Sequence, residues 1–433
     1  MDKHKTKNTM IKAFINKSFL KDERSIYVGF GIFIAITLVF WPLLNSIICF
    51  LFFIYWLLFS KKEFSLKTNK SQTLLLFLSL YIVALIGSLY SVNIKEAMLE
   101  VKQKIPLALF PIILGTTRGV TRKDTEKILI SFSLATIIGS FICLLNGLIY
   151  YLNTGSKIKL SGYDLIILKQ TTPSIFCVFV VFSVSYIANK IADHYIRDLT
   201  NKYIRWFWVG FFFNFGFMLL LGNRMTLFCF ALIVIYYLFC YFKTFRQRVF
   251  VILIFVFANV FIVKINPRLQ KQWQEIIDIY RKNEIKLDED KSLGREWGGA
   301  SIRIAIWRCS WDIVKKYWIT GVGNGDVQDF LQKSYEDRKF FFASRYNRYN
   351  SHNQFLQQLL STGLLSVFLF CLCLLVPLKN SLFIRRNIVY TFFILTFAIV
   401  CITESLLEIN KGIVWYSFFN SIFAFQTTNN SFK

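Results

Sequence analysis

The sequence predicts an all-α, polytopic integral membrane protein with about twelve transmembrane helices. Hydrophobic residues make up 55% of the 433 residues, whereas charged residues make up 18%, below the quarter or so of a typical soluble domain. The hydrophobic residues occur in blocks of roughly 16 to 24, and about 20 apolar residues in a helix cross the hydrocarbon core of a bilayer. Basic residues gather between these blocks. This combination indicates a membrane protein rather than a soluble one.

Twelve hydrophobic blocks define the predicted spans, and the fourth is short and interrupted by Pro106 and Pro111. We place nine spans within 26–263 and three within 352–427. The approximate ranges are 26–42, 44–60, 72–91, 104–117, 127–150, 172–189, 205–222, 224–242, 248–263, 353–376, 387–403 and 412–427.

Loop charge predicts the orientation. The tail 1–25 is rich in lysine, and every second loop after it is also basic. Because positive charge is retained on the cytoplasmic side, both termini, including the short tail 428–433, are expected there. The formal net charge of +26 therefore reflects topology and contact with membrane lipids, and no nucleic-acid partner is expected.

This orientation puts the long loop 264–351 outside the cytoplasm, where we expect a small helical cap. Ser301 is the expected N-cap of a helix over 302–317, in which Ile306, Cys309 and other apolar residues share one face. A second helix is expected over roughly 326–341. The glycines between them, in 320–325, match turn chemistry rather than a nucleotide-binding loop.

Three basic residues on the predicted outer face could carry chemistry. Arg224 lies in a very tight turn, Arg303 in the first loop helix, and His352 at the start of the tenth span. Each has an ordinary alternative: a headgroup contact for Arg224, a solvated helix face for Arg303, and a helix cap or interface anchor for His352. Together, two guanidiniums and an imidazole suit a membrane-borne diphosphate, with the imidazole as general base.

The nine cysteines are interpreted as small packing residues. Cys371 and Cys373 are close in sequence but lie in mid-span with no nearby histidine or carboxylate, so they do not form a metal motif. No metal site and no cofactor are expected.

Several stretches resemble the O-antigen ligase and O-antigen polymerase superfamily of bacterial GT-C type membrane glycosyltransferases. His352-Asn353 followed by 363–366 is similar to the family's histidine motif, in which Ser366 is a small departure. Arg303 with Trp307, followed by 317–323, is similar to the loop pattern that precedes that motif.

The resemblance implies an inverting, metal-independent reaction on the periplasmic face of the bacterial inner membrane. The implied donor is an undecaprenyl diphosphate-linked glycan, and the implied acceptor is a hydroxyl of the lipid A core or of another glycan. By this analogy His352 activates the acceptor, while Arg224 and Arg303 bind the diphosphate. Further candidates for lining the site are Asn353, Lys102, Lys104 and Glu404.

Three functions remain open from the sequence. A ligase is favoured over a polymerase because the one long outer loop, 264–351, carries the histidine motif at its end. A flippase or transporter of lipid-linked glycan is the alternative from another class, but no half-to-half similarity of the kind found in many transporters is evident.

Overall fold

The computed structural model describes residues 23–63, 68–118, 120–168, 171–196, 202–242, 244–265 and 299–427, with Gln270, Gln274 and Ile277. These residues form helices and no named β-strand, which confirms the all-α prediction. The tail 428–433 and most of the tail 1–25 lie outside the described residues, as does most of 264–298.

The first described helix is Glu23–Phe40. The others are α2 (Pro42–Phe59), α3 (Asn69–Leu89), α4 (Ile94–Lys104), α5 (Pro106–Gly115), α6 (Arg122–Thr154), η1 (Ile158–Leu160), η2 (Tyr163–Leu165), α7 (Pro173–Tyr195), α8 (Ile204–Leu221), α9 (Arg224–Tyr241), α10 (Phe245–Ile265), α12 (Gly299–Tyr317), α13 (Val327–Asp337), η4 (Phe342–Asn347), α14 (Gln354–Lys379), η5 (Asn380–Ile384), α15 (Ile388–Val400), η6 (Leu406–Glu408) and α16 (Asn410–Phe425).

Eight of the described helices are long and apolar enough to cross a membrane, which fits a polytopic membrane protein. They are Glu23–Phe40, α2, α3, α6, α7, α8, α9 and α14 with its extension to Ile384. The other four predicted spans coincide with α5, α10, α15 and α16. The count of twelve crossings stays a prediction.

The fourth predicted span, 104–117, is built differently from a single helix. With 10 residues and a rise of about 1.5 Å per residue, α5 is roughly 15 Å long, half of the hydrocarbon thickness. Only Ile105 separates it from α4, and both helices pack on α3. The break falls here because Pro106 has no N–H to donate and favours the first turn of a new helix.

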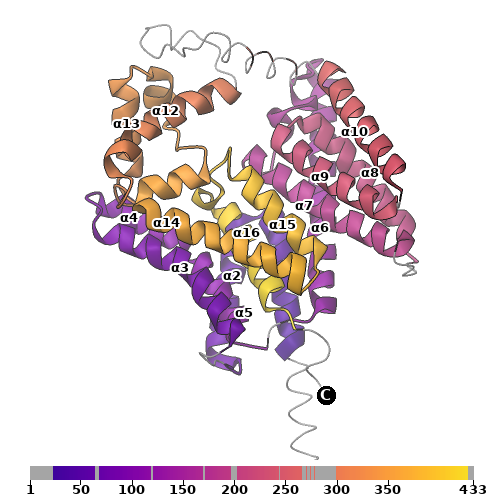
Figure 1. Ribbon diagram of the computed structural model, residues 1–433, viewed down its shortest axis with the longest axis horizontal. Helices are drawn as coiled ribbons and strands as arrows, with labels where there is room; N and C mark the ends of the chain where they lie inside the picture. The colour runs from indigo at the N-terminus through magenta and orange to yellow at the C-terminus, as the bar shows by residue number, and fades with distance from the viewer. Residues whose placement is uncertain are drawn as a thin grey trace, which may run out of the picture.

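Helix α7 lies at the centre of the bundle and is buried along almost its whole length. Its sequence is apolar on all sides, as expected for a helix surrounded by protein, and α6, α8, α9 and α15 pack around it (Figure 1). Phe182 on α7 packs edge-on against Phe393 on α15 and Trp415 on α16, with ring centroids 5.2 and 5.6 Å apart. This aromatic core holds the C-terminal helices against α7.

Helices α12 and α13 form a cap at one end of the bundle, at the edge of the molecule in Figure 1. Ile306, Cys309 and other residues of the predicted apolar face are buried there with Leu331 and Tyr335 of α13, which confirms the predicted pair of loop helices. Ser301 lies inside α12, which the structure describes from Gly299 onward, so the prediction that Ser301 is the N-cap is wrong. The Ser301 side chain is instead buried.

The loop between α12 and α13 attaches the cap to α3 and α14 through backbone hydrogen bonds. Val322 and Gly323 donate to the carbonyls of Leu360 and Ser361 on α14, at 2.8 and 2.9 Å. The carboxylate of Asp326 accepts from two amides just after α3, including that of Asn93 at 2.7 Å. Gly323 and its neighbour Gly321 have φ of +96° and +68°, which confirms the turn interpretation of the glycines.

Helix α14 is broken to receive this loop. Gly363 has φ +70°, and a Cβ there would lie 2.1 Å from the carbonyl oxygen of Ile319. The amide of Leu364 donates to the carbonyl of Trp318 at 3.0 Å. The glycine that follows the histidine motif is therefore required by a close approach between two backbones.

Gly363→Ala should lower the apparent thermal midpoint of the detergent-solubilised protein. The strained backbone alone costs about 1–3 kcal/mol, and the clash with Ile319 adds to it. Gly216→Ala is the matched control, because Gly216 lies within α8 with no atom near its missing Cβ, and alanine favours a helix. Equal midpoints for the two variants would contradict this account of α14.

Candidate active site

His352 is held in a strained backbone conformation between the cap and α14. Its φ is +44°, a region that non-glycine residues seldom adopt and that is frequent at functional sites. The amide of His352 donates to Oδ1 of Asn350 at 3.0 Å, and the amide of Asn353 donates to Oγ of Ser405 at 3.1 Å. Asn353 also caps α14 by accepting from the amide of Leu356. Asn353 thus anchors the start of α14 directly after His352.

The carboxylate of Glu404 joins His352 to Arg303. Its Oε2 lies 3.4 Å from Nδ1 of His352, and its Oε1 lies 2.5 Å from Nη2 of Arg303. Ser174, at the start of α7, donates to Oε1 at 3.0 Å. Glu404 is only 6% exposed, so a buried carboxylate connects the cap, the bundle and the histidine loop.

Glu404 is ionised at neutral pH. Burial by itself raises the pKa of this carboxyl, but the hydrogen bond with His352 and the charge of Arg303 outweigh burial and hold the pKa below its ordinary value. Because an ionised carboxylate only accepts hydrogen bonds, we assign the proton of a neutral His352 to Nδ1. Its Nε2 is then the atom that can accept a proton.

Arg303 is bound through each of its three nitrogens. Nε donates to the carbonyl of Thr403 at 2.8 Å, Nη1 donates to the carbonyl of Gly299 at 2.7 Å, and Nη2 pairs with Glu404. The guanidinium therefore ties α12 to the segment that carries Glu404. Its five N–H groups exceed these three contacts, so it keeps donors for a further anion.

A second buried ionic cluster fixes the other end of the segment 404–408. Nζ of Lys104 lies 2.8 Å from Glu100 and 3.2 Å from Glu408. Gln354, the first residue of α14, donates to Glu408 at 3.2 Å and accepts from the amide of Leu407 at 2.7 Å. Lys104 thus reaches the segment next to the histidine, whereas Lys102 on the same helix is exposed.

Arg224 lies at the same end of the bundle but in a different group of helices. It begins α9 and is half-buried, and Asn223 caps the helix by accepting from Thr226. Phe217, near the end of α8, packs edge-on against Phe176, which is close to Ser174 on α7. Within the part of the chain that the structure describes, the bonding partners of Glu404 and His352 do not include Arg224.

A groove of about 580 Å³ opens beside Asn353, between the outer face of α12 and the start of α14. Trp307 and Trp311 lie one turn apart on its α12 side, and Nε1 of Trp307 donates to the carbonyl of Ser351. Its charged lining residues are Arg308, Asp312, Lys315 and Arg338. Indole rings together with cationic side chains provide surfaces for sugar rings and for anionic groups.

Sequence reasoning brought Arg303 and His352 together and named Glu404 only as a lining candidate. It missed Ser174 and Ser405, because a serine near a helix end has many ordinary roles. It also missed the pairing of Lys104 with Glu408. The sequence did contain a signal for this pairing, because Lys104, Glu100 and Glu408 lie beside hydrophobic segments, where charged side chains require partners.

Residues 209–371 match the family described as O-antigen ligase. This match, which covers less than half of the chain, supports membership of the O-antigen ligase and polymerase family. The matched segment holds Arg224, Arg303 and His352, whereas Glu404 lies beyond its end. No match is found among curated proteins. Membership supports an O-antigen ligase or polymerase type of activity in the membrane, with lipid-linked glycan and an acceptor as general partners.

Glu404→Gln should destabilise the protein by about 1–3 kcal/mol at pH 7, because it removes a buried charge paired with Arg303. A carboxyl with a lowered pKa stabilises the folded state above its ordinary value of 4.5, and this contribution is lost as the pH falls through the lowered value. Thermal midpoints measured from pH 7 downwards should therefore converge for the variant and the wild type.

Glu63→Gln is the control, because Glu63 pairs with Arg118 at the surface, where both side chains are half exposed and an ion pair contributes little. A difference between wild type and Glu404→Gln that stays constant into the acid range would refute the ionised state of Glu404.

Proposed function

We propose that this protein transfers a glycan from an undecaprenyl diphosphate carrier to a hydroxyl acceptor, as an O-antigen ligase acting on the lipid A core. The observation that supports this most is the pairing of Nδ1 of His352 with the buried, ionised Glu404. This arrangement leaves Nε2 to act as a general base and stabilises the imidazolium that forms.

In the proposed reaction, Nε2 of His352 takes the proton of the acceptor hydroxyl. The acceptor oxygen forms a bond to the anomeric carbon as the bond from that carbon to the diphosphate oxygen breaks, with inversion. Arg303 and Arg224 neutralise the charge that grows on the departing diphosphate, a role for which guanidinium groups suit because they remain charged and bind phosphate oxygens in pairs.

The proposed orientation puts the cap and His352 on the periplasmic side of the bacterial inner membrane and both termini in the cytoplasm. The distribution of basic loops supports it. A donor carried by a lipid can then approach the site from within the bilayer, at the level where the cap meets the bundle.

A polymerase that joins carrier-linked repeat units is the alternative within the family, because the same base and the same diphosphate contacts would serve it. The ligase is favoured because the outer loop that ends at His352 is single and long. The two enzymes differ in acceptor, so the products distinguish them.

His352→Ala should abolish glycan transfer, because it removes the Nε2 atom that takes the acceptor proton in the proposed reaction. His194→Ala is the matched control, since His194 lies in the last turn of α7, at the opposite end of that helix from Ser174. The measurement is the profile of lipopolysaccharide and carrier-linked glycan in a deletion strain complemented with each variant at equal membrane levels.

Accumulation of carrier-linked polymer on the periplasmic face would support a ligase, and products with a single repeat would support the polymerase. Lipid-linked substrate retained on the cytoplasmic face would support a flippase and contradict the proposal, as would full transfer by His352→Ala.

We propose further that the groove between α12 and α14 holds the saccharide of one substrate, stacked on Trp311. Trp311→Ala should then raise the KM for glycan transfer several-fold with little change in the thermal midpoint, because this side chain is 52% exposed. Trp318→Ala is the control, at 50% exposure and outside the groove. Equal KM values for the two variants in a reconstituted transfer assay would exclude this role.

A further inference from the structure

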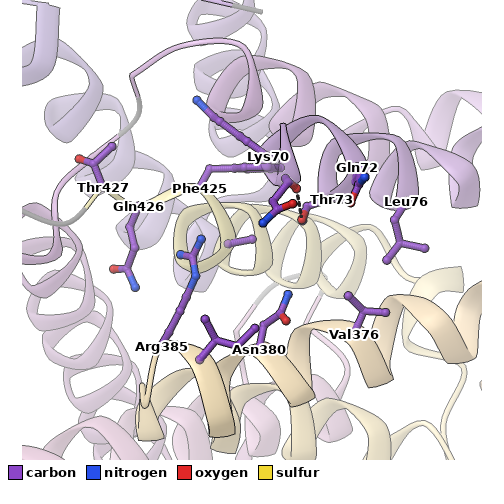
Figure 2. Close-up of a pocket in the computed structure, with 13 residues that line it drawn as sticks. Lys70, Gln72, Thr73, Leu76, Val376, Asn380, Arg385, Phe425, Gln426 and Thr427 are labelled. Atoms are coloured by element: carbon purple, nitrogen blue, oxygen red, sulfur yellow. Dashed lines mark hydrogen bonds between the residues drawn. The ribbon is translucent and has the colours of Figure 1, made fainter. Parts of the chain in front are cut away.

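A second cavity lies at the opposite end of the bundle from His352. It measures about 560 Å³ and lies between the start of α3, the end of α14 with η5, and the end of α16 (Figure 2). His352 precedes α14, whereas this cavity is lined by residues at the other end of that helix. Helix α3 has 21 residues, so its two ends are roughly 30 Å apart. The cap loop binds just after the last turn of α3, whereas this cavity lies at its first turn. In the proposed orientation the cavity faces the cytoplasmic leaflet.

Two cationic side chains from separate elements line the cavity. Lys70 comes from the first turn of α3, and Arg385 follows η5. Lys70 donates to the carbonyl of Thr117, and Nη1 of Arg385 donates to the carbonyl of Phe423 at 2.8 Å. None of the thirteen lining residues is acidic, and neither cation forms an ion pair with a described carboxylate. Glu63 is close enough to act on Lys70 electrostatically, but it pairs with Arg118 outside the cavity. The lining itself therefore carries two positive charges and no acidic side chain.

Neutral polar groups complete this end of the cavity. Asn380 and Gln426 lie near Arg385, while Gln72 lies beside Thr73, whose hydroxyl donates to the carbonyl of Asn69 (Figure 2). The amide oxygen of Gln426, an acceptor, is buried with no partner among the described residues, so the contribution of this side chain to an anion would come from its NH₂ group. These amides can supply N–H donors to an anion that already pairs with the two cations.

The other side of the cavity is apolar. Leu76 and Val376 lie away from Arg385 in Figure 2. Leu76 follows the first turn of α3 and Val376 precedes the end of α14, so both are closer than the two cations to the middle of the bundle. The lining therefore changes from cationic to apolar in the direction of the membrane interior. A ligand with an anionic head and a hydrocarbon chain matches this order.

We propose that this cavity binds a phosphate group between Lys70 and Arg385, presented by an anionic phospholipid whose acyl chain lies along Leu76 and Val376. Basic pockets between transmembrane helices on the cytoplasmic side are suited to such headgroups. The bound lipid would join α3, α14 and α16, the three helices whose ends line the cavity.

The test is the thermal midpoint of the full-length protein in detergent, measured with phosphatidylglycerol, with phosphatidylcholine and with inorganic phosphate. Phosphatidylglycerol should raise the midpoint by about 3–5 °C at saturation, because a ligand that binds only the folded state stabilises it. Phosphatidylcholine should have little effect, since its head carries no net charge.

The double variant Lys70→Gln/Arg385→Gln should lose the phosphatidylglycerol shift. Lys123→Gln/Arg386→Gln is the matched control, because it removes two exposed charges that do not line this cavity, and it should keep the shift. Each shift is taken relative to the same variant without lipid, so any loss of basal stability does not affect the comparison.

Val376→Trp separates the two sources of phosphate, because it fills the apolar side and leaves both cations in place. Loss of the lipid shift in Val376→Trp supports a phospholipid. An equal shift with inorganic phosphate, retained in Val376→Trp, supports the phosphate site but assigns it to a soluble anion and overturns the lipid. An undiminished phosphatidylglycerol shift in Lys70→Gln/Arg385→Gln overturns the site.

Discussion

The buried carboxylate of Glu404 is the interaction on which the candidate active site depends. It accepts from the guanidinium of Arg303, from the hydroxyl of Ser174 and from the ring of His352, which belong to the cap, to the central helix and to the loop before α14. A buried carboxylate is costly unless it is paired and hydrogen-bonded. These three groups must therefore stay together for the charge to be tolerated, and this requirement fixes the position of the imidazole.

The break in α14 serves the same arrangement. The cap could not approach the bundle closely if α14 were a regular helix with side chains at every position. Gly363 removes a side chain at the point where the backbone of Ile319 passes, and α12 is then held at the distance where Arg303 reaches Glu404. His352 is thus needed for the proposed chemistry, whereas Gly363 is needed so that the cap and α14 can pack closely.

Much of this architecture could be predicted from the sequence, because long apolar blocks and basic loops report directly on a helical membrane protein. The pairing of His352 with Glu404 could not, since it depends on how two distant loops meet. The short fourth span with a break at Pro106 was visible in the sequence. The pairing of Lys104 with Glu408 was not, because Glu408 lies in a distant loop. Where a residue acts through a long-range contact, composition and periodicity carry no information about its partner.

The ion pair between Arg303 and Glu404 affects how the proposed reaction would proceed. The charge of Arg303 is compensated by Glu404 in this structure, and His352 beside it is neutral in the proposed role. In the proposed reaction a diphosphate would bind the N–H groups of Arg303 that Glu404, Thr403 and Gly299 leave unused. The same carboxylate would orient Nδ1–H of His352 and so aim Nε2 at the acceptor hydroxyl. Glu404 would thereby hold the proposed donor contact and the proposed base in one fixed arrangement, because both of them pair with a single buried charge.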